Sequence, residues 1–483
     1  MTLLALNDRV REDLAMLNLP AANWVPRRVS AAGPVLDALV VGAGMLGLSA
    51  SFALKRLGVR NHLMLDRAAA GQEGPWVTYA RMETLRSPKH LVGPAQDIPS
   101  LTFRAWYTAQ HGAAGWAALG KIPRGAWMDY LTWFRDVLAL PVRSGVAVQA
   151  IRPGPDGLVA IETDQAGMLL ARHVVLATGR DGLGASRLPD WVPVVRGPHI
   201  RHSMEPISFA GLSGQDVAVV GASASAVDNA ATTLEHGAAV VHLLVRRAAL
   251  PTLNRFRGMV HPGFTHGFAG LDDAVRLEFL HAAFKGAVAP PRESLLRLAR
   301  HPGFRLHLGA PVLGVEEDAQ GVSIRLPNAR LRVAMLILGT GFSVDLARRP
   351  ELSAAASLAK RWRDTEIEVG VLGDFADYPY LGPAFELQER VPGTAPWLRQ
   401  VHAFNIGAIA SHGMVSGDIP GVGDGARRLA EGIARELFVA DADLHLVALY
   451  SYAEAELLGN EVPADRVVTW ENDATSPTLR RAG

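Results

Sequence analysis

Apolar and polar positions along the chain repeat one arrangement, strand then glycine turn then helix, at two distant places. In the first, LDALVVGAGMLGLSASFALKRLGV, residues 38–41 form a continuous apolar run, as expected for a parallel strand buried on both faces. Helical spacing of apolar residues then extends from Met45 to Leu57 and ends at Gly58. A second short apolar strand, NHLMLD, follows. The pattern predicts a βαβ unit that begins near residue 36.

The arrangement returns in the middle of the chain as QDVAVVGASASAVDNAATTLEHGAAVVHLLVRR. It again predicts a strand, a turn, a helix that ends near Gly237, and a strand that closes on two arginines. Two further apolar strands, HVVLATG and MLILGTG, each end in a Thr-Gly step where the chain can cross between domains. We therefore predict an α/β fold with two Rossmann-like, doubly wound dinucleotide-binding domains, the second inserted in the first.

The predicted domain organisation is discontinuous. The chain length of 483 residues exceeds what one hydrophobic core usually supports. We expect an N-terminal helical extension, an FAD-binding domain in two pieces, an inserted NADP-binding domain and a C-terminal cap. Their ranges are 1–34 for the extension, 35–205 and 330–440 for the FAD domain, 206–329 for the NADP domain and 441–483 for the cap.

The first turn has the chemistry of a phosphate site. Gly42, Gly44 and Gly47 form GxGxxG between a strand and a helix, which permits a tight turn, close approach of a pyrophosphate and close helix–strand packing. The helix N-terminus offers unpaired N–H groups and a partial positive charge. Asp66 ends the next strand, where a carboxylate accepts hydrogen bonds from ribose hydroxyls and repels a 2′-phosphate. The alternative is a purely structural strand-to-helix turn.

The second turn differs at its third position and at the end of the following strand. Gly221, Ser223 and Ala226 occupy the three motif positions, and alanine still permits close helix–strand packing. Arg246 and Arg247 stand where the first unit has its carboxylate, and guanidinium groups can hold a 2′-phosphate in a bidentate manner. The contrast predicts NADPH rather than NADH here, although a tandem arginine pair is also a common feature of solvated surfaces.

Composition narrows the function. The chain has 48 basic and 47 acidic residues, and this balance favours neither nucleic acid nor an anionic membrane as a partner. It has no cysteine, which excludes disulfides and a CxxC redox pair, and its 16 histidines show no metal-ligand spacing, so we expect no metal. Charges interrupt the apolar N-terminus and no apolar run reaches the length of a membrane span, so we expect a cytoplasmic enzyme.

An N-terminal FAD turn, a later NADP turn and two bridging Thr-Gly strands together resemble the class B flavoprotein monooxygenases. That superfamily holds the flavin-containing monooxygenases, the Baeyer–Villiger monooxygenases and the ornithine/lysine N-hydroxylases. The segments METLRSPKHLVGPAQDIPSLTFRAWY and IPRGAWMDYLTWF are most similar to the N-hydroxylase pattern, in which a proline–arginine step opens a helix. HAFNIGAIASHGMVSGDIPGVGDGARRLAEGIARELF resembles the closing FAD segment, with a helix expected over 426–438 whose N-terminus points at the flavin.

The resemblance and the two turns together imply a set of site residues. Trp76, Met82, Leu85, Arg86 and Lys89 are candidates for the flavin surroundings, while Asn405 and His412 are candidates beside the ring or substrate. Arg86, Lys89 and His412 are the catalytic candidates, the two cations as donors to the flavin or to an acidic substrate. The cofactor-binding candidates are Gly42, Gly44, Met45, Gly47, Asp66, Arg67, Gly74, Trp76, Thr178, Gly179, Gly221, Ser223, Ser225, Ala226, Arg246, Arg247, Thr340 and Gly341.

The region before the second turn departs from the pattern. The flavin-containing and Baeyer–Villiger families carry FxGxxxHxxx(F/W), whereas this chain reads VVRGPHIRHSMEP, with His202 five residues after Gly197. A direct transfer of Baeyer–Villiger activity is therefore in doubt. Gly197, His199 and His202 are candidates for a hinge between the domains.

The resemblance implies a reaction. NADPH reduces FAD, the reduced flavin forms a C4a-(hydro)peroxyflavin with O₂, and an oxygen atom passes to a small organic substrate, foremost at an amine nitrogen. Baeyer–Villiger or sulfide oxygenation, a flavin-dependent NADPH reductase or diaphorase, and a non-enzymatic flavin-binding regulatory module are the alternatives. The expected partners are the substrate and O₂, with self-association into a homo-oligomer open.

Overall fold

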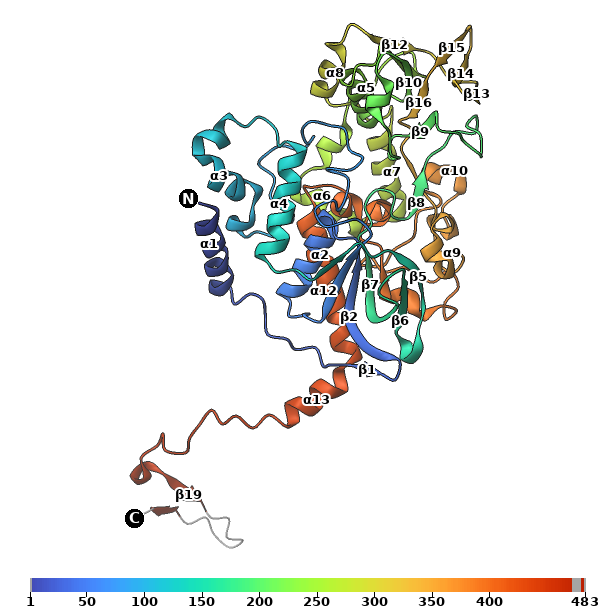
Figure 1. The fold of residues 1–483 in the computed structure, drawn as a ribbon. Helices are drawn as coiled ribbons and strands as arrows, with labels where there is room; N and C mark the ends of the chain where they lie inside the picture. The colour runs from blue at the N-terminus through green and yellow to red at the C-terminus, as the bar shows by residue number, and fades with distance from the viewer. Residues whose placement is uncertain (1, 471–478, 482–483) are drawn as a thin grey trace. The chain divides into compact units, whose positions relative to one another are not determined.

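The structure is a computed structural model that describes residues 2–470 and 479–481. A first sheet forms where the sequence predicts the FAD domain (Figure 1). Its strands follow the order β4-β3-β2-β7-β6-β5, with β2 parallel to both β3 and β7, and β6 and β5 added antiparallel. These strands are β1 (Val29–Ser30), β2 (Gly33–Val41), β3 (His62–Asp66), β4 (Val142–Ser144), β5 (Val148–Pro153), β6 (Val159–Thr163), β7 (Met168–Leu176) and β18 (Val401–His402).

Helices cover this sheet because their apolar faces need burial. Helix α2 (Met45–Arg56) follows the first turn as predicted, and ten of its twelve residues are buried. Helix α4 (Arg124–Val137) begins directly after Pro123, which confirms the proline–arginine start read from the sequence. Helix α12 (Val422–Ala440) is longer at both ends than the predicted 426–438. The remaining helices on this part are α1 (Leu3–Met16), α3 (Phe103–Ala118) and α9 (Ser353–Ala356).

The second sheet is entirely parallel and follows the order β12-β11-β10-β16-β9. The first strand of the unit lies in the middle and the order reverses beside it, as in a doubly wound nucleotide-binding fold. Helices α5 (Ala224–Glu235) and α8 (Arg292–Ala299) pack on it. Its strands are β9 (Ile200–His202), β10 (Asp216–Val220), β11 (Val240–Val245), β12 (Phe304–Leu308) and β16 (Met335–Leu338).

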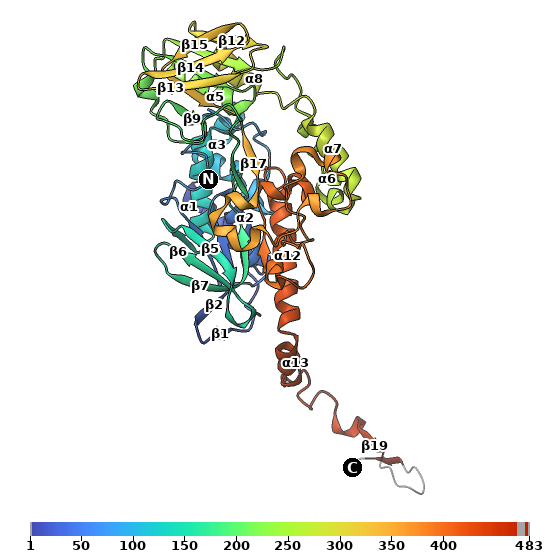
Figure 2. The same cartoon turned by 90° about the vertical axis from the view of Figure 1, so that its right-hand side faces the viewer.

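An antiparallel three-stranded sheet covers the other face of this second sheet (Figure 2). It consists of β13 (Gly314–Asp318), β14 (Gly321–Leu326) and β15 (Ala329–Val333). Val322 and Ile324 from this sheet share a buried cluster with Leu336 and Leu338 of β16. The chain crosses between the two parts through β8 (Gly184–Ser186) and β17 (Phe342–Val344), which pair antiparallel.

Two helices of the inserted segment do not pack on the second sheet but on residues of the first part of the molecule. Helices α6 (Pro262–Gly267) and α7 (Asp273–Phe284), with the turn between them, contribute Phe264, Phe268 and Leu277 to a cluster with Trp362 and Ile409. Helix α10 (Val369–Leu372) and short helix α11 (Ile409–His412) complete that cluster. The second sheet also includes strands at 200–202 and 335–338, outside the predicted insert of 206–329. The domain bounds thus stay a prediction, with these two differences.

Residues 438–483 form a separate unit. It contains helix α13 (Ala442–Tyr450) and a hairpin of β19 (Val468–Trp470) with β20 (Leu479–Arg481), and the Phe438 ring stacks on His445 at 4.6 Å between centroids. The predicted C-terminal cap, 441–483, falls in this unit, and residues 471–478 and 482–483 of it lie outside the described residues. Among the described helices, none has the length and apolar character needed to cross a membrane.

Candidate functional site: two dinucleotide turns and the junction between them

The backbone of the first turn is packed so closely that two of its motif positions have no room for a side chain. Gly42 has φ +101°, and a Cβ there would lie 2.6 Å from the Ala177 carbonyl oxygen at the end of β7. A Cβ on Gly47 would lie 1.8 Å from the Gly42 carbonyl oxygen. Helix α2 begins after Gly44 with no side-chain cap on its first N–H groups. Those donors are therefore available to a phosphate.

Asp66 lies directly under this turn. Its Oδ2 accepts a hydrogen bond from the Ala43 N–H and its Oδ1 one from the Ala68 N–H, both at 2.8 Å. The carboxylate is buried, and the lone pairs left on each oxygen suit ribose hydroxyls. The next residue, Arg67, pairs with Asp181 at 3.7 Å, just beyond the Thr178-Gly179 step.

The segment after Asp66 returns to the turn at Gly74. A Cβ on Gly44 would lie 3.6 Å from the Gly74 Cα, so two glycine backbones face each other there. Trp76 lies against Gly74 and packs edge-on against Trp127 at 6.2 Å. The buried Trp76 Nε1 has no hydrogen-bond partner among the described residues. An orphaned indole N–H beside a phosphate turn fits a bound group with acceptor atoms, as FAD has.

Helix α12 begins against the same turn helix. The Ser49 hydroxyl of α2 donates to the Val422 carbonyl at 3.4 Å, and a Cβ on Gly423 would lie 3.1 Å from the Gly93 carbonyl oxygen. The start of α12 is thus held beside α2.

The second turn has alanine instead of glycine at its third motif position, and its surroundings differ accordingly. Gly221 has φ +135°, and a Cβ there would lie 2.6 Å from the Gly339 carbonyl oxygen. The Ala226 methyl group is accommodated because β16 is followed by Gly339, where a Cβ would lie only 2.6 Å from it. Ser223 precedes α5 without capping it through its side chain, and the Ser225 hydroxyl donates to the Ser203 hydroxyl at 2.8 Å. The N-terminus of α5 therefore also offers free donors.

Arg246 and Arg247 follow β11 at its carboxyl end, and both are exposed. Arg247 donates to the Gly286 carbonyl at 2.9 Å. Arg246 has no hydrogen bond or ion pair within residues 2–470 and 479–481, so its guanidinium is free for a 2′-phosphate. The donor set fits NADP.

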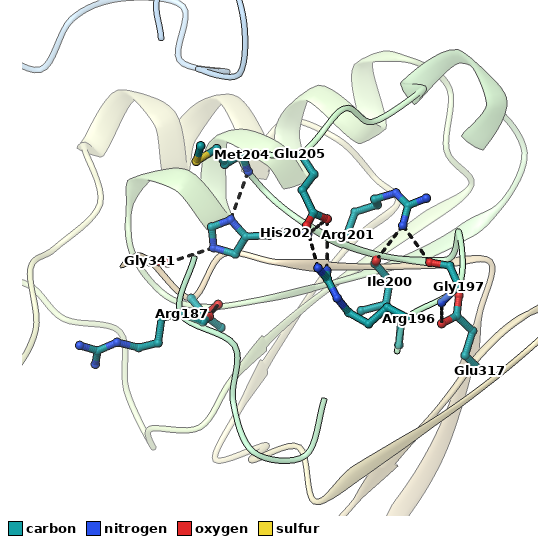
Figure 3. Close-up of polar contacts among 11 residues, drawn as sticks. Arg187, Arg196, Gly197, Ile200, Arg201, His202, Met204, Glu205, Glu317 and Gly341 are labelled. Carbon is teal, nitrogen blue, oxygen red and sulfur yellow. Dashed lines mark hydrogen bonds and ion pairs between the residues drawn. The ribbon is translucent and has the colours of Figure 1, made fainter. Parts of the chain in front are cut away.

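The crossings between the two parts are braced by polar contacts (Figure 3). The Arg187 N–H donates to the Gly341 carbonyl at 2.9 Å, and the same carbonyl lies 3.0 Å from His202 Nε2. The Thr340 hydroxyl donates to the Arg187 carbonyl. At the other Thr-Gly step, the Asn405 amide donates to the Thr178 hydroxyl at 3.3 Å and to the nearby Leu176 carbonyl at 2.9 Å. The Thr-Gly steps thus hold the crossings together.

The hinge candidates lie beside these crossings. The Glu317 carboxylate accepts the N–H group of Gly197 (Figure 3) and that of His199, both at 2.7 Å. A Cβ on Gly197 would lie 2.6 Å from that carboxylate. His202 is fully buried, and its N–H donates to Glu205 at 2.8 Å. The segment is anchored on the second domain, and a hinge motion there stays a prediction.

The three catalytic candidates have different surroundings. The Lys89 ammonium donates to the carbonyls of Trp116 and Leu119, which holds the end of α3. His412 is buried, with Nε2 2.9 Å from the Gly382 carbonyl and Nδ1 3.2 Å from the Arg428 guanidinium. Burial, and then Arg428, lower the pKa of His412 to about 3, so it is neutral at physiological pH.

Arg86 is exposed and reaches from the first part of the chain to the second, where it donates to the Ala289 carbonyl. Partial burial of the guanidinium and then Arg180 lower the pKa of Arg86, whereas Asp418 and Asp228 raise it. The hydrogen bond to Ala289 runs from the predicted FAD domain to the predicted NADP domain.

The sequence did not reveal the contact that joins the domains at Arg297 of α8. This buried side chain donates to Glu235 at 2.7 Å and to the Arg81 carbonyl at 2.8 Å, and lies 3.7 Å from Asp228. Arg297 thereby ties α5 and α8 to the segment that precedes Arg86. It had no signal in the sequence because its partners lie far away along the chain.

Comparison with known proteins agrees with this geometry. Residues 39–288 match the pyridine nucleotide-disulphide oxidoreductase family. The chain is 42% identical over 465 residues to the FAD-dependent urate hydroxylase of Xanthomonas campestris, covering 95% of this chain and 98% of the relative.

Solved structures share the fold at low identity. The ornithine hydroxylase of Pseudomonas aeruginosa superposes with a TM-score of 0.66 at 17% identity, covering 83% of this chain and 100% of its own. The L-lysine 6-monooxygenase of Pseudomonas syringae gives 0.65 at 19% identity, covering 83% and 99%.

Because the chain has no cysteine, the disulphide chemistry in the family's description cannot apply to its own side chains. The family match and the 42% identity show that the chain belongs to the pyridine nucleotide-disulphide oxidoreductase family, and it is an FAD- and NADPH-dependent flavoprotein monooxygenase that acts on a small molecule.

Proposed function

We propose that this monooxygenase hydroxylates urate or a closely related oxygenated purine. The observation that carries the proposal is the 42% identity to a urate hydroxylase along nearly the full length of both chains. The position of Arg86 at the domain junction supports it, because a guanidinium suits the carbonyl-rich, anionic edge of such a ring.

In this proposal the first turn binds FAD and the second turn binds NADP. The N-terminus of α2 and Asp66 would hold the pyrophosphate and adenosine ribose of FAD, and Trp76 would donate its free indole N–H to the same cofactor. The N-terminus of α5 would hold the NADP pyrophosphate, with Arg246 and Arg247 at the 2′-phosphate. Met45, Arg67, Ser225 and the Thr-Gly steps are further proposed cofactor contacts.

Bound FAD, once reduced by NADPH, supplies the oxygen-activating chemistry. The chain's own contribution is to hold substrate and cofactors at the junction. The start of α12 would direct its partial positive charge toward the flavin. Lys89 and His412 would act through position, since their polar atoms are engaged within the protein.

The test is a steady-state assay of purified holoenzyme with NADPH and urate in air. We expect NADPH oxidation to depend on urate, one urate to disappear per NADPH, and little H₂O₂ to form. NADPH oxidation that yields only H₂O₂ while urate persists would contradict the proposal and favour a diaphorase.

Oxygenation at an amine nitrogen is the second candidate. The N-hydroxylase-like segments that precede and open α4 favour it. The same assay with L-ornithine and L-lysine in place of urate distinguishes the two. Amine-dependent NADPH oxidation with hydroxylamine formation, and none with urate, would select this candidate.

A further inference from the structure

Three segments that are distant in sequence meet near Arg86. Residues 84–86 are held to the segment just before α4, since the Leu85 N–H donates to the Ile122 carbonyl at 2.8 Å. The second segment contains Gly179 and Arg180, the third contains Gly417 and Asp418, and Ile406 contacts both. Its N–H donates to the Gly179 carbonyl at 3.4 Å, and its Cδ1 lies 2.8 Å from a Cβ built on Gly417.

The third segment also reaches back to the first. The Ile419 side chain lies 3.6 Å from a Cβ built on Gly93, and the Trp127 ring of α4 lies 3.2 Å from the same point. Arg86, Arg180 and Asp418 therefore come from adjoining backbone. We call these three residues the junction cluster.

The junction cluster has two positive side chains and one carboxyl group, so its positive charge is not fully balanced. Neither Arg86 nor Arg180 has an ion pair within 4.0 Å among the described residues, and both are exposed. Burial raises the pKa of Asp418, and Arg180 and then Arg86 oppose that rise. Each guanidinium thus acts electrostatically on the same carboxyl, and Arg180 also acts on Arg86. Asp228 and Arg257 of the second domain add one charge of each sign.

The cluster lies between the two dinucleotide turns. Arg86 donates to the Ala289 carbonyl, and the preceding residue, Val288, accepts from the Ser223 hydroxyl of the second turn at 3.4 Å. Gly179 and Asp418 belong to the segments that end β7 and lead into α12 on the FAD side. A substrate must reach this region for chemistry that both cofactors serve.

We propose that Arg86 and Arg180 bind the substrate as an anion and that Asp418 accepts a ring N–H, so that the junction cluster selects anionic, planar, carbonyl-bearing heterocycles. The inference rests on the proposed function, because urate is such an anion at neutral pH. Two unpaired guanidiniums stabilise delocalised negative charge in a way that neutral donors do not, and the planar forks match paired carbonyl and deprotonated ring nitrogen atoms.

The test is calorimetric titration of urate into oxidised holoenzyme, for the wild type and for Arg180→Gln and Arg86→Gln. Each substitution removes a charge-assisted interaction, so we expect the Kd for urate to rise by roughly 10- to 100-fold. Arg180→Lys, which keeps the charge, should recover part of the loss. Arg152→Gln, an exposed arginine paired with Glu162 on β5 and β6, is the matched control and should leave the Kd unchanged.

Benzoate and benzamide, planar probes that differ in charge, test the site without relying on urate. The wild type should prefer benzoate, and Arg180→Gln and Arg86→Gln should lose that preference. Equal binding of the two probes by the wild type, or unchanged urate and benzoate binding in both variants, would overturn the inference. If the variants weaken anion binding but the wild type forms no product from urate, the proposed function fails and the anion site stands.

Discussion

The two glycine turns use one backbone arrangement for two purposes, and the positions where they differ are informative. The third position is Gly47 in the first turn, where a Cβ would lie 1.8 Å from a carbonyl oxygen, and Ala226 in the second, where Gly339 makes room. Two residues further along each helix, α2 has Ser49, which contacts the start of α12, and α5 has Asp228, which lies 3.7 Å from Arg297. The same helix position thus contacts the start of α12 in one domain, and in the other it lies beside the arginine that contacts the Arg81 carbonyl of the first part.

The ends of the following strands differ in charge. Asp66 is buried and accepts two backbone N–H groups, whereas Arg246 and Arg247 are exposed. A buried acid bound to its own turn suits a nucleotide that stays in place. Exposed cations suit a 2′-phosphate that arrives and leaves. The residues that distinguish the two cofactors therefore lie at the end of the strand that follows each turn, and not in the glycine motif itself.

The largest expected effect is that of Gly47→Ala. The added methyl group meets the Gly42 carbonyl, a backbone atom that cannot move without opening the turn. Overpacking of this kind costs on the order of 3 kcal/mol. We expect loss of most bound FAD, measured by absorbance after gel filtration, and a lower melting temperature.

Ala226→Gly is the matched change in the second turn. It removes a methyl group, and glycine within a helix costs about 1 kcal/mol relative to alanine. FAD content should stay at the wild-type level. If Gly47→Ala retains FAD as well as Ala226→Gly does, the steric contrast between the turns is wrong.

The second effect concerns the arginine pair. Replacing both Arg246 and Arg247 by alanine removes charge-assisted contacts to the 2′-phosphate, so the preference for NADPH over NADH should fall by roughly 10- to 100-fold. The measurement is the ratio of kcat/KM for the two nucleotides, with NADH kinetics as the internal control. An unchanged ratio would place the 2′-phosphate elsewhere.

The smallest effect concerns Asp228. Burial raises the pKa of Asp228 from its ordinary 3.8 to about 6, and Ser294, Arg297 and Arg86 oppose this only in part. Between these pH values the folded protein binds a proton that the unfolded chain does not, so this group stabilises the fold as the pH falls from about 6 towards 3.8. Above pH 6 the buried charge costs stability.

Asp228→Asn should therefore raise the free energy of unfolding at neutral pH by about 1–2 kcal/mol, with little gain near pH 4. Urea unfolding at several pH values measures it. Ser49→Ala at the equivalent position of α2 is the control without a titrating group and should show no such pH dependence. A destabilised Asp228→Asn at neutral pH would mean that the ion pair with Arg297 outweighs burial.

Much of the fold followed from local pattern. Apolar runs such as residues 38–41 and helical spacing from Met45 predicted both turns, and Pro123 predicted the start of α4, because strand burial, glycine geometry and helix starts depend on neighbouring residues. The packing of α6 and α7 against Trp362 could not be predicted in this way, since those partners lie far apart along the chain.

The candidate site was predictable to a similar extent. The two glycine turns and the charges after them are local features that the sequence predicts, and their role in binding phosphates stays a prediction. The hydrogen bonds from Lys89 to the carbonyls of Trp116 and Leu119 and those of Arg297 are long-range contacts, and long-range contacts leave no periodicity in the sequence. The electrostatic effect of Arg180 on Asp418 likewise joins residues far apart along the chain.

The central claim is that FAD occupies the first turn and NADP the second, and a crystal structure of the complex with FAD and NADP⁺ tests it most directly. We predict the FAD adenosine ribose at Asp66 and the NADP⁺ 2′-phosphate between Arg246 and Arg247, with both pyrophosphates at the N-termini of α2 and α5. A structure with NADP⁺ at the first turn, or with its 2′-phosphate away from both arginines, would contradict the account.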